Sequence, residues 1–181
     1  MAEKAEEPTH FSIQKLYIKD VSFESPGSPS VFSFQQWEPQ IELNLNNAHA
    51  AVDDKLFEAV LTVTATVKHQ EKTAFLIEVQ QAGLFAISGF NDQDRSYLLG
   101  SQCMNILFPY ARETISDMTT RGGFPPLILS PVNFDALYQQ HMQQQQQAKD
   151  GKVEDNSGEA PSIEDTSVEA DTKEADGAIK H

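Results

Sequence analysis

The stretch IELNLN, residues 41–46, alternates apolar and polar residues without exception. One parity carries Ile41, Leu43 and Leu45, and the other carries only acidic and amide side chains. Strict alternation of this kind is typical of a β-strand with one buried and one solvated face. The stretch therefore predicts a strand of an antiparallel sheet, because such a sheet can keep one face wet.

Three further segments show a period of two: residues 11–24, 56–68 and 73–87. The alternation is imperfect in the first of them, where Leu16 and Ile18 share a parity with Asp20 and Glu24. The connections between the four segments are short or rich in turn residues, so we expect successive strands to be antiparallel neighbours. The polar parity predicts a wet face that is acidic and rich in threonine.

Helical patterns begin only after the last strand. Residues 92–121 open with Asp92 and Asp94, continue with apolar residues at helical spacing, and end at two glycines. We expect Pro109 to kink or locally break this helix. A second helix begins after Asn133, a good capping residue. The fold class is therefore α+β, with a four-stranded antiparallel sheet followed by two helices.

The first helix is apolar over a wider arc than packing against one sheet requires. This width predicts that the helix also lies in an interface between subunits. The residues assigned to that interface are Tyr97, Cys103, Ile106, Leu107 and Tyr110.

Composition restricts the function classes. The 181 residues include 27 acidic and 13 basic residues, giving a net charge of −14 that disfavours nucleic acid as a partner. The chain has no apolar run of the roughly 18 residues that a membrane span needs, and its first ten residues do not resemble a signal peptide. One cysteine fits a reducing compartment. We expect a cytoplasmic protein.

The composition changes near residue 148. Residues 149–181 contain almost no large apolar side chain and carry ten acidic residues and four lysines. Such a composition cannot bury enough surface to fold. We expect a flexible N-terminus at residues 1–9, one folded domain at 10–148, and a disordered acidic tail at 149–181.

Catalytic motifs are absent: the sequence has no glycine-rich phosphate loop, HExxH, paired CxxC or GxSxG. The five histidines are scattered and are expected to lie on the surface, and NDQDRS at 91–96 fits a helix cap better than a calcium loop. Cys103 is expected to be a packed small hydrophobe. Trp37 is equally compatible with a core position and with a binding anchor. We expect no enzyme activity, no cofactor and no metal.

The stretch NILFPYARETISDMTTRGGFPPLILSPVNFDALY, residues 105–138, resembles the signature of the SecB family of export chaperones. KDVSFESPGSP, VFSFQQWEP and TAFLIEVQQAGLFAISG are similar to the same family in the same order. The resemblance covers roughly residues 10–141 and not the tail. Met104 departs from it, since many relatives have proline there.

The resemblance implies a homotetramer, a dimer of dimers, that holds unfolded preproteins without ATP and delivers them to the SecA motor. It also explains why the proline-rich loop at 122–134 is apolar, because in this family the loop and second helix form one wall of a client groove whose floor is the sheet. By position, that groove includes Trp37, Ile41, Leu43, Leu45, Phe124, Leu127, Leu129, Phe134, Leu137 and Tyr138. The positions that dock the basic, zinc-bearing SecA tail correspond to Asp20, Glu24, Leu76 and Glu78.

Two alternatives remain open on the sequence alone. The same groove could be the closed pocket of a small-molecule or lipid-binding domain with modest hydrolase activity, although no convergent polar groups support that. A SecB-like chaperone dedicated to a toxin–antitoxin pair is the other. Client identity, tetramer affinity and the role of the tail are not determined by the sequence.

Overall fold

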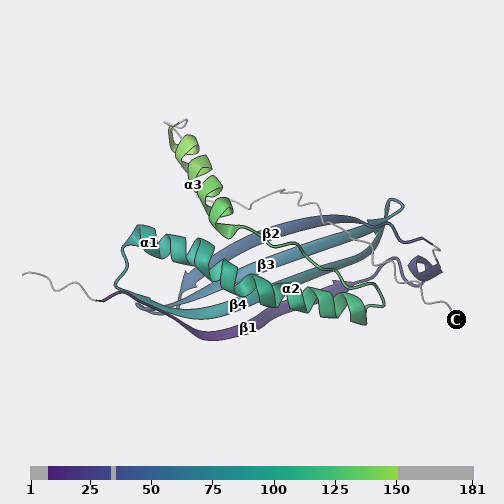
Figure 1. Cartoon of the computed structure of the whole chain (residues 1–181), viewed down its shortest axis with the longest axis horizontal. Helices are drawn as coiled ribbons and strands as arrows, with labels where there is room; N and C mark the ends of the chain where they lie inside the picture. Colours follow the sequence, from purple (N-terminus) through teal and green to yellow (C-terminus); the bar gives the residue numbers. More distant parts are fainter. Residues whose placement is uncertain (1–7, 34–35, 151–181) are drawn as a thin grey trace, which may run out of the picture.

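The computed structural model describes residues 8–33 and 36–150 and has the predicted α+β architecture (Figure 1). Its elements are β1 (His10–Glu24), η1 (Ser30–Ser33), β2 (Gln40–Ala51), β3 (Leu56–His69), β4 (Lys72–Ser88), α1 (Asp92–Tyr97), η2 (Leu98–Gln102), α2 (Cys103–Arg121) and α3 (Phe134–Asp150). All four strands overlap the predicted segments. Helix α3 continues two residues beyond the predicted boundary at 148, and the rest of the predicted tail and most of the predicted flexible N-terminus lie outside the described residues.

The sheet is antiparallel throughout and has the strand order β1-β4-β3-β2. The prediction that all successive strands are neighbours is therefore wrong for β1 and β2, which form the two edges. The connection of residues 25–39 is not a hairpin, because it contains the 3-10 turn η1 and places Val31 in the core. This connection carries the chain from one edge of the sheet to the other.

Two register shifts in β1 explain its imperfect alternation. They lie between Ile13 and Lys15 and between Ile18 and Asp20. Each shift adds a residue to β1 relative to β4, so side chains between the shifts change face. Leu16 and Ile18 therefore share the helix side of the sheet with Val21, and the intervening residues turn to the other side.

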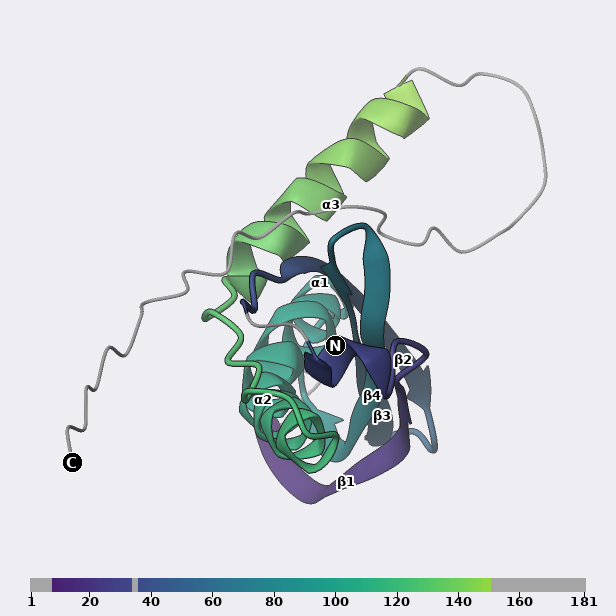
Figure 2. The same ribbon diagram turned by 90° about the vertical axis from the view of Figure 1, so that its right-hand side faces the viewer.

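Helical segments α1, η2 and α2 form one layer along one face of the sheet. Helices α1 and α2 run lengthwise over the strands, whereas α3 projects away from the body (Figures 1 and 2). Hydrophobic side chains of β3, β4 and α2 fill the space between the layers, and the largest of them that are fully buried include Leu61, Ile77, Phe85, Leu107 and Ile115. The opposite face of the sheet, called the polar face below, has no helix over it among the described residues.

Helix α1 begins at the predicted cap region, with Asn91 as the capping residue whose side chain accepts a hydrogen bond from the Asp94 amide at 2.8 Å. The helical run departs from α-helical geometry at the π-helical segment η2, which was not predicted. The predicted local break at Pro109 is wrong, because α2 continues through that residue. Asn133 caps α3 as predicted, accepting a hydrogen bond from the Ala136 amide at 3.0 Å.

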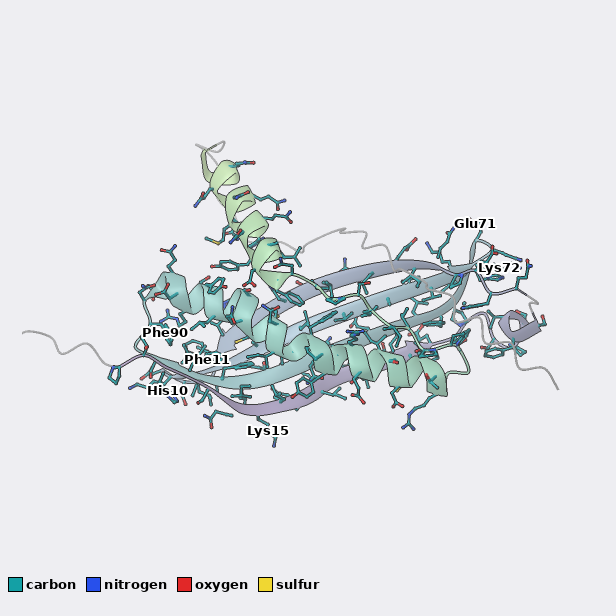
Figure 3. The ribbon with its side chains drawn as sticks, viewed as in Figure 1. His10, Phe11, Lys15, Glu71, Lys72 and Phe90 are labelled. Carbon is teal, nitrogen blue, oxygen red and sulfur yellow. The ribbon has the colours of Figure 1, made fainter. Side chains whose placement is uncertain are left out.

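The long axis of the sheet separates two ends of the molecule. Figure 3 shows Glu71 and Lys72 at the turn between β3 and β4, and His10, Phe11 and Phe90 at the opposite end. Strand β3 ends at His69, beside the turn that carries Glu71 and Lys72. Features that involve His69 therefore belong to the Glu71 end.

Cys103 provides a direct test of the contact between α2 and the sheet. Its side chain is completely buried, as expected for a packed hydrophobe, and burial raises the pKa of its thiol to about 12. The reactive thiolate is therefore scarce near pH 8. We expect iodoacetamide to alkylate the native protein at least about a thousandfold more slowly than the chain unfolded in urea, followed by mass spectrometry. Similar rates in the two states would mean that the layers open readily.

Candidate functional site

A cluster of aromatic rings lies at the Glu71 end of the helix side. Trp37 stacks on His69 with ring centroids 5.3 Å apart, and it lies 5.6 Å from Phe124. Phe124 also contacts Phe75 at 4.5 Å and Phe32 at 5.1 Å. Trp37 is only half-buried and Phe32 is 52% exposed. The aromatic cluster, defined as these five rings, thus joins the core to an accessible apolar surface.

The aromatic cluster shows where His69 and Trp37 lie relative to the core. His69 is buried rather than on the surface, because the alternation of β3 places its last residue on the helix side beneath Trp37. Trp37 packs against the core and keeps part of its ring accessible, so it is not a fully buried core residue.

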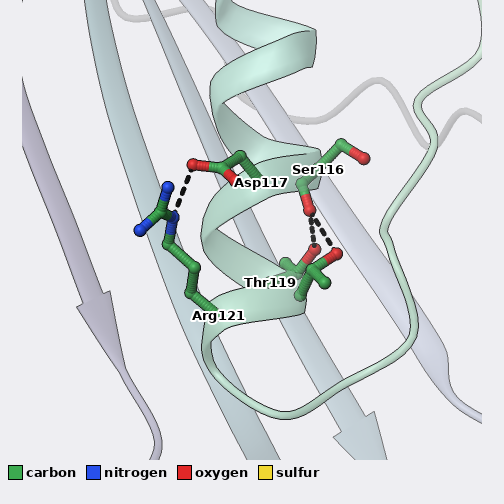
Figure 4. A network of polar contacts seen from close by, with 5 residues as sticks. Ser116, Asp117, Thr119 and Arg121 are labelled. Carbon is green, nitrogen blue, oxygen red and sulfur yellow. Dashed lines mark hydrogen bonds and ion pairs between the residues drawn. The ribbon is translucent and has the colours of Figure 1, made fainter.

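The loop of residues 122–133 is fastened to the end of α2. Figure 4 shows the polar contacts there: Thr119 donates to the Ser116 carbonyl at 3.0 Å, and Arg121 pairs with Asp117 at 2.7 Å. The buried Thr119 hydroxyl also accepts a hydrogen bond from the Leu127 amide at 3.0 Å. The Leu127 bond, together with one from the Phe124 amide to the Thr119 carbonyl at 3.1 Å, attaches the loop to α2. From there the loop runs back towards α3 (Figure 1).

The loop directs alternate apolar side chains inwards and outwards. Phe124, Leu127 and Leu129 are buried, with 5%, 8% and 2% of their surfaces exposed, whereas Ile128 is 56% exposed. The inward residues pack into the core of this chain. The space between the loop and the sheet is consequently filled by the loop's own side chains, and the accessible apolar surface lies around the loop.

A pocket of about 180 Å³, lined by both apolar and polar side chains, opens between β2 and α3. Its hydrophobic lining residues are Leu45, Leu61, Phe134, Leu137, Tyr138 and Met142. Gly100 of η2 allows the Tyr138 ring to approach, since a Cβ at that position would lie 2.7 Å from the ring. His49 and His141 face the same pocket, and burial lowers the pKa of His49.

Polar contacts from the preceding helical segments position α3. The Asp135 carboxylate accepts hydrogen bonds from the hydroxyls of Ser101 and Tyr97, both at 2.6 Å. These hydrogen bonds lower the pKa of Asp135, the Ser101 bond being the largest cause. One turn later, the Tyr138 hydroxyl donates to Ser96 at 3.0 Å. These bonds fix the start of α3 to α1 and η2, and Phe134, Leu137 and Tyr138 of α3 form one wall of the pocket.

The predicted groove residues are only partly brought together. Leu45, Phe134, Leu137 and Tyr138 line the pocket, and Trp37 and Phe124 belong to the aromatic cluster. Ile41 and Leu43, half-buried on the helix side of β2, connect the two regions in sequence. Leu127 and Leu129 belong to the loop, and their side chains are buried in the core.

Phe32, Leu61 and Met142 were not among the predicted groove residues. The signal for Phe32 was an aromatic-rich stretch following the serine- and proline-rich connection at residues 25–30. Leu61 belongs to an evenly alternating strand and Met142 follows the apolar face of the second helix, so periodicity alone marked them only as core positions. Their place in the pocket depends on how β2, β3 and α3 meet.

The residues assigned to the subunit interface differ in their exposure. Cys103 and Leu107 are fully buried within this chain and have no accessible surface of their own. Tyr110 is 48% exposed and Ile106 is half-buried. Tyr97 is half-buried, and its hydroxyl donates a hydrogen bond to Asp135 within the same chain. A hollow of about 750 Å³ lies on the outer side of α2, where Ile128 and Val132 of the loop face Phe108 and Arg112.

The four residues assigned to SecA docking share the polar face. Glu24 lies opposite Leu76 and Asp20 lies opposite Gln80, and directly opposed residues point to the same side of a sheet. Glu78 lies two residues from both Leu76 and Gln80 and therefore points the same way. The predicted common parity is confirmed, and it places three carboxylates near the edge formed by β1.

Two other acidic residues of the polar face are neutralised within the chain. Lys68 pairs with Glu42 at 2.5 Å, and Lys19 pairs with Glu58 at 2.7 Å. Tyr17 also donates a hydrogen bond to Glu58. The hydrogen bond from Lys19 is the main cause that lowers the pKa of Glu58, while the bond to Glu58 raises the pKa of Tyr17 to about 12.

By contrast, Asp20, Glu24 and Glu78 form no salt bridge with any cation in the described part of the chain. Uncompensated carboxylates on a flat polar surface favour contact with a positively charged partner. The internal ion pairs thus leave one acidic region, at the Asp20, Glu24 and Glu78 positions, without compensation.

No cluster of potential metal ligands occurs within residues 8–33 and 36–150. Nor does any helix in those ranges have the length and hydropathy of a membrane-spanning segment. The described residues thus form two candidate binding surfaces: an apolar surface on the helix side of the sheet and an acidic region on its polar face.

Comparison with known proteins identifies the family of this chain. The profile of the SecB family, described as preprotein translocase subunit SecB, matches residues 3–145. The chain belongs to the SecB family. Three relatives named protein-export protein SecB support this, from Methylococcus capsulatus (56% identical, covering 81% of this chain and 95% of the relative), Nitrosococcus oceani (51%, 79% and 88%) and Pseudomonas fluorescens (47%, 90% and 94%).

A solved structure supports the fold. A SecB-like chaperone of Mycobacterium tuberculosis, in complex with a peptide from the HigA1 antitoxin, matches with a TM-score of 0.58 and 19% identity, covering 67% of this chain and 90% of that one. SecB proteins are export chaperones and not enzymes. This SecB chain is accordingly a protein-export chaperone, and the alternative of a small-molecule-binding domain with hydrolase activity is wrong.

Proposed function

We propose that this SecB protein holds unfolded preproteins, without ATP, on the apolar surface formed by the aromatic cluster and the pocket between β2 and α3. The observation that carries the proposal is a series of half-buried apolar residues. It begins at Trp37, just before β2, and continues through Leu43 to Leu45 on the helix side of β2. Such a surface binds apolar segments of many sequences, because burial of apolar area is not directional.

One such surface alone binds weakly. Burying roughly 300 Å² of apolar area contributes about 7 kcal/mol at about 25 cal/mol per Å², while association costs on the order of 4–15 kcal/mol. Several sites on one oligomer that engage the same chain raise the avidity by roughly 10² to 10⁴. Unfolded clients are selected by mass action, since only they expose suitable segments. Assembly is therefore part of the holding function.

The proposed assembly is a homotetramer built as a dimer of dimers. Supporting it, Ile13, Ile18 and Val21 of β1 point to the helix side and remain 47%, 49% and 37% exposed. Tyr110 adds an exposed ring on α2. Exposed apolar surface of this kind is typical of a protein interface. The proposed contacts are thus the helix side of β1 and the outer side of α2 with Ile106 and Tyr110.

Delivery uses the other face of the sheet. In this proposal, the basic, zinc-bearing tail of the SecA motor docks on Asp20, Glu24, Leu76 and Glu78, the acidic region that the internal ion pairs leave uncompensated. Docking and client holding then take place on opposite faces, so one need not displace the other. The protein acts in the cytoplasm, where preproteins are made.

General export is favoured over service to a single toxin–antitoxin pair. The relatives at 47–56% identity all carry the name protein-export protein SecB, whereas the chaperone crystallised with an antitoxin peptide is 19% identical.

The mass of the protein in solution tests the assembly and the holding function together. At micromolar concentration near neutral pH we expect light scattering to give four times the 20.1 kDa of one chain. Adding a reduced, unfolded preprotein should increase the mass by one client per oligomer, and adding the same preprotein in its folded form should not. A monomer that fails to retain unfolded client would refute the proposal.

A further inference from the structure

Glu78 differs from the other two uncompensated acids in its surroundings. It lies on β4, a central strand, whereas Asp20 and Glu24 are exposed on the edge strand β1. The Thr64 hydroxyl donates to one Glu78 carboxylate oxygen at 2.9 Å, and the Gln80 amide approaches the other at 3.4 Å. Thr64 lies directly opposite Glu78 on β3. The carboxylate is therefore held from two sides.

The two hydrogen bonds to the Glu78 carboxylate leave it able to accept a further bond from a ligand. A carboxylate has about four sites for accepting hydrogen bonds, so two neutral donors leave part of its capacity for a cation. Neither Thr64 nor Gln80 carries a charge, so the negative charge of Glu78 is not cancelled. Glu58 shows the opposite arrangement on the same face, since Lys19 pairs with it directly.

We propose that Thr64 is a positioning residue for the binding of a basic partner segment, acting by fixing the Glu78 carboxylate. This inference rests on the proposed docking function of the polar face. A carboxylate that is already ordered loses less side-chain entropy when a lysine or arginine binds it, and ordering costs about 0.5–1.5 kcal/mol for a flexible side chain. Thr64 thereby increases affinity without contacting the partner.

The test is calorimetric titration with a synthetic zinc-loaded peptide of the SecA tail. Thr64→Val, which keeps the shape and removes the hydroxyl, should weaken binding about three- to tenfold. Thr64→Ser should restore binding because it retains the hydroxyl. Thr62→Val is the matched control, since Thr62 lies two residues away on the same face, opposite Gln80, and should leave binding unchanged. Thr64→Ala provides a second hydroxyl-free variant if the valine chain does not assemble.

A double-mutant cycle separates positioning from a general effect on the sheet. Glu78→Gln should weaken binding by itself, and Thr64→Val should add nothing in that background. If the wild-type protein does not bind the peptide, the docking function fails and this inference fails with it. If Glu78→Gln weakens binding while both hydroxyl-free variants bind like wild type, only the role of Thr64 is overturned. Equal losses in Thr62→Val and Thr64→Val would overturn it as well.

Discussion

Replacing Asp20, Glu24 and Glu78 together by lysine should abolish binding of the SecA tail, with a loss of at least about a hundredfold in affinity. The three carboxylates have no cation partner among the described residues, so reversal places like charges opposite a basic segment without breaking an internal ion pair. Client holding should persist, because the apolar surface lies on the other face of the sheet. Calorimetric titration with the tail peptide, and separately with an unfolded preprotein, measures both.

The control for this variant reverses Asp54 and Glu71, two exposed acids in the connections between strands. It changes the net charge in the same direction and should bind the peptide normally. Wild-type docking should also weaken as salt rises from about 0.05 to 0.5 M, since the screening length falls from roughly 14 to 4 Å. Loss of client binding with intact peptide binding would mean that the two faces have been exchanged.

The second large effect concerns the apolar surface. Replacing Trp37 and Leu43 together by alanine should weaken binding of an unfolded preprotein by about 2–4 kcal/mol, which is roughly 30- to 1000-fold. Trp37 lies between His69 and Phe124 in the aromatic cluster, and its removal exposes both rings. Fluorescence anisotropy of a labelled, reduced client measures the affinity, and light scattering reports whether the oligomer persists.

Val52→Ala is the matched control for that variant. Val52 is 58% exposed in the connection between β2 and β3 and belongs to neither the cluster nor the pocket. Its removal should leave the client affinity unchanged. An intact oligomer of the Trp37 and Leu43 variant that binds clients as tightly as wild type would contradict the assignment of this surface.

The strands could be predicted from the sequence because a half-buried strand carries its own period. The place of β1 in the sheet could not, because its pairing with β4 joins segments far apart in the chain and depends on two register shifts. Leu16 and Ile18 appeared as defects in the alternation, and they become regular only when the partner strand is known. The π-helical segment η2 has no comparable mark, since its residues fit an α-helical pattern equally well.

The site could be predicted in composition and less well in geometry. Apolar residues in a proline-rich loop indicated a surface of unusual character, but the sequence does not distinguish an accessible side chain such as Ile128 from a buried one such as Leu129. The orientation of the β2 side chains was easier to predict, because the strict alternation from residue 41 to 46 assigns each side chain to one face of the sheet. The ion pairs of Glu42 and Glu58 lie between strands, so the uncompensated acids could not be picked out before the register was known.

The π-helical segment at Leu98–Gln102 has a consequence for how the chain tolerates changes in length. A π-helical turn holds about one residue more than an α-helical turn, so it acts as a one-residue insertion that rotates the helix before it by about 100° relative to the helix after it. Deleting one residue there would make the helix more regular and yet turn Tyr97 away from Asp135. A deletion that simplifies the local backbone would thus release α3 and the pocket wall it forms.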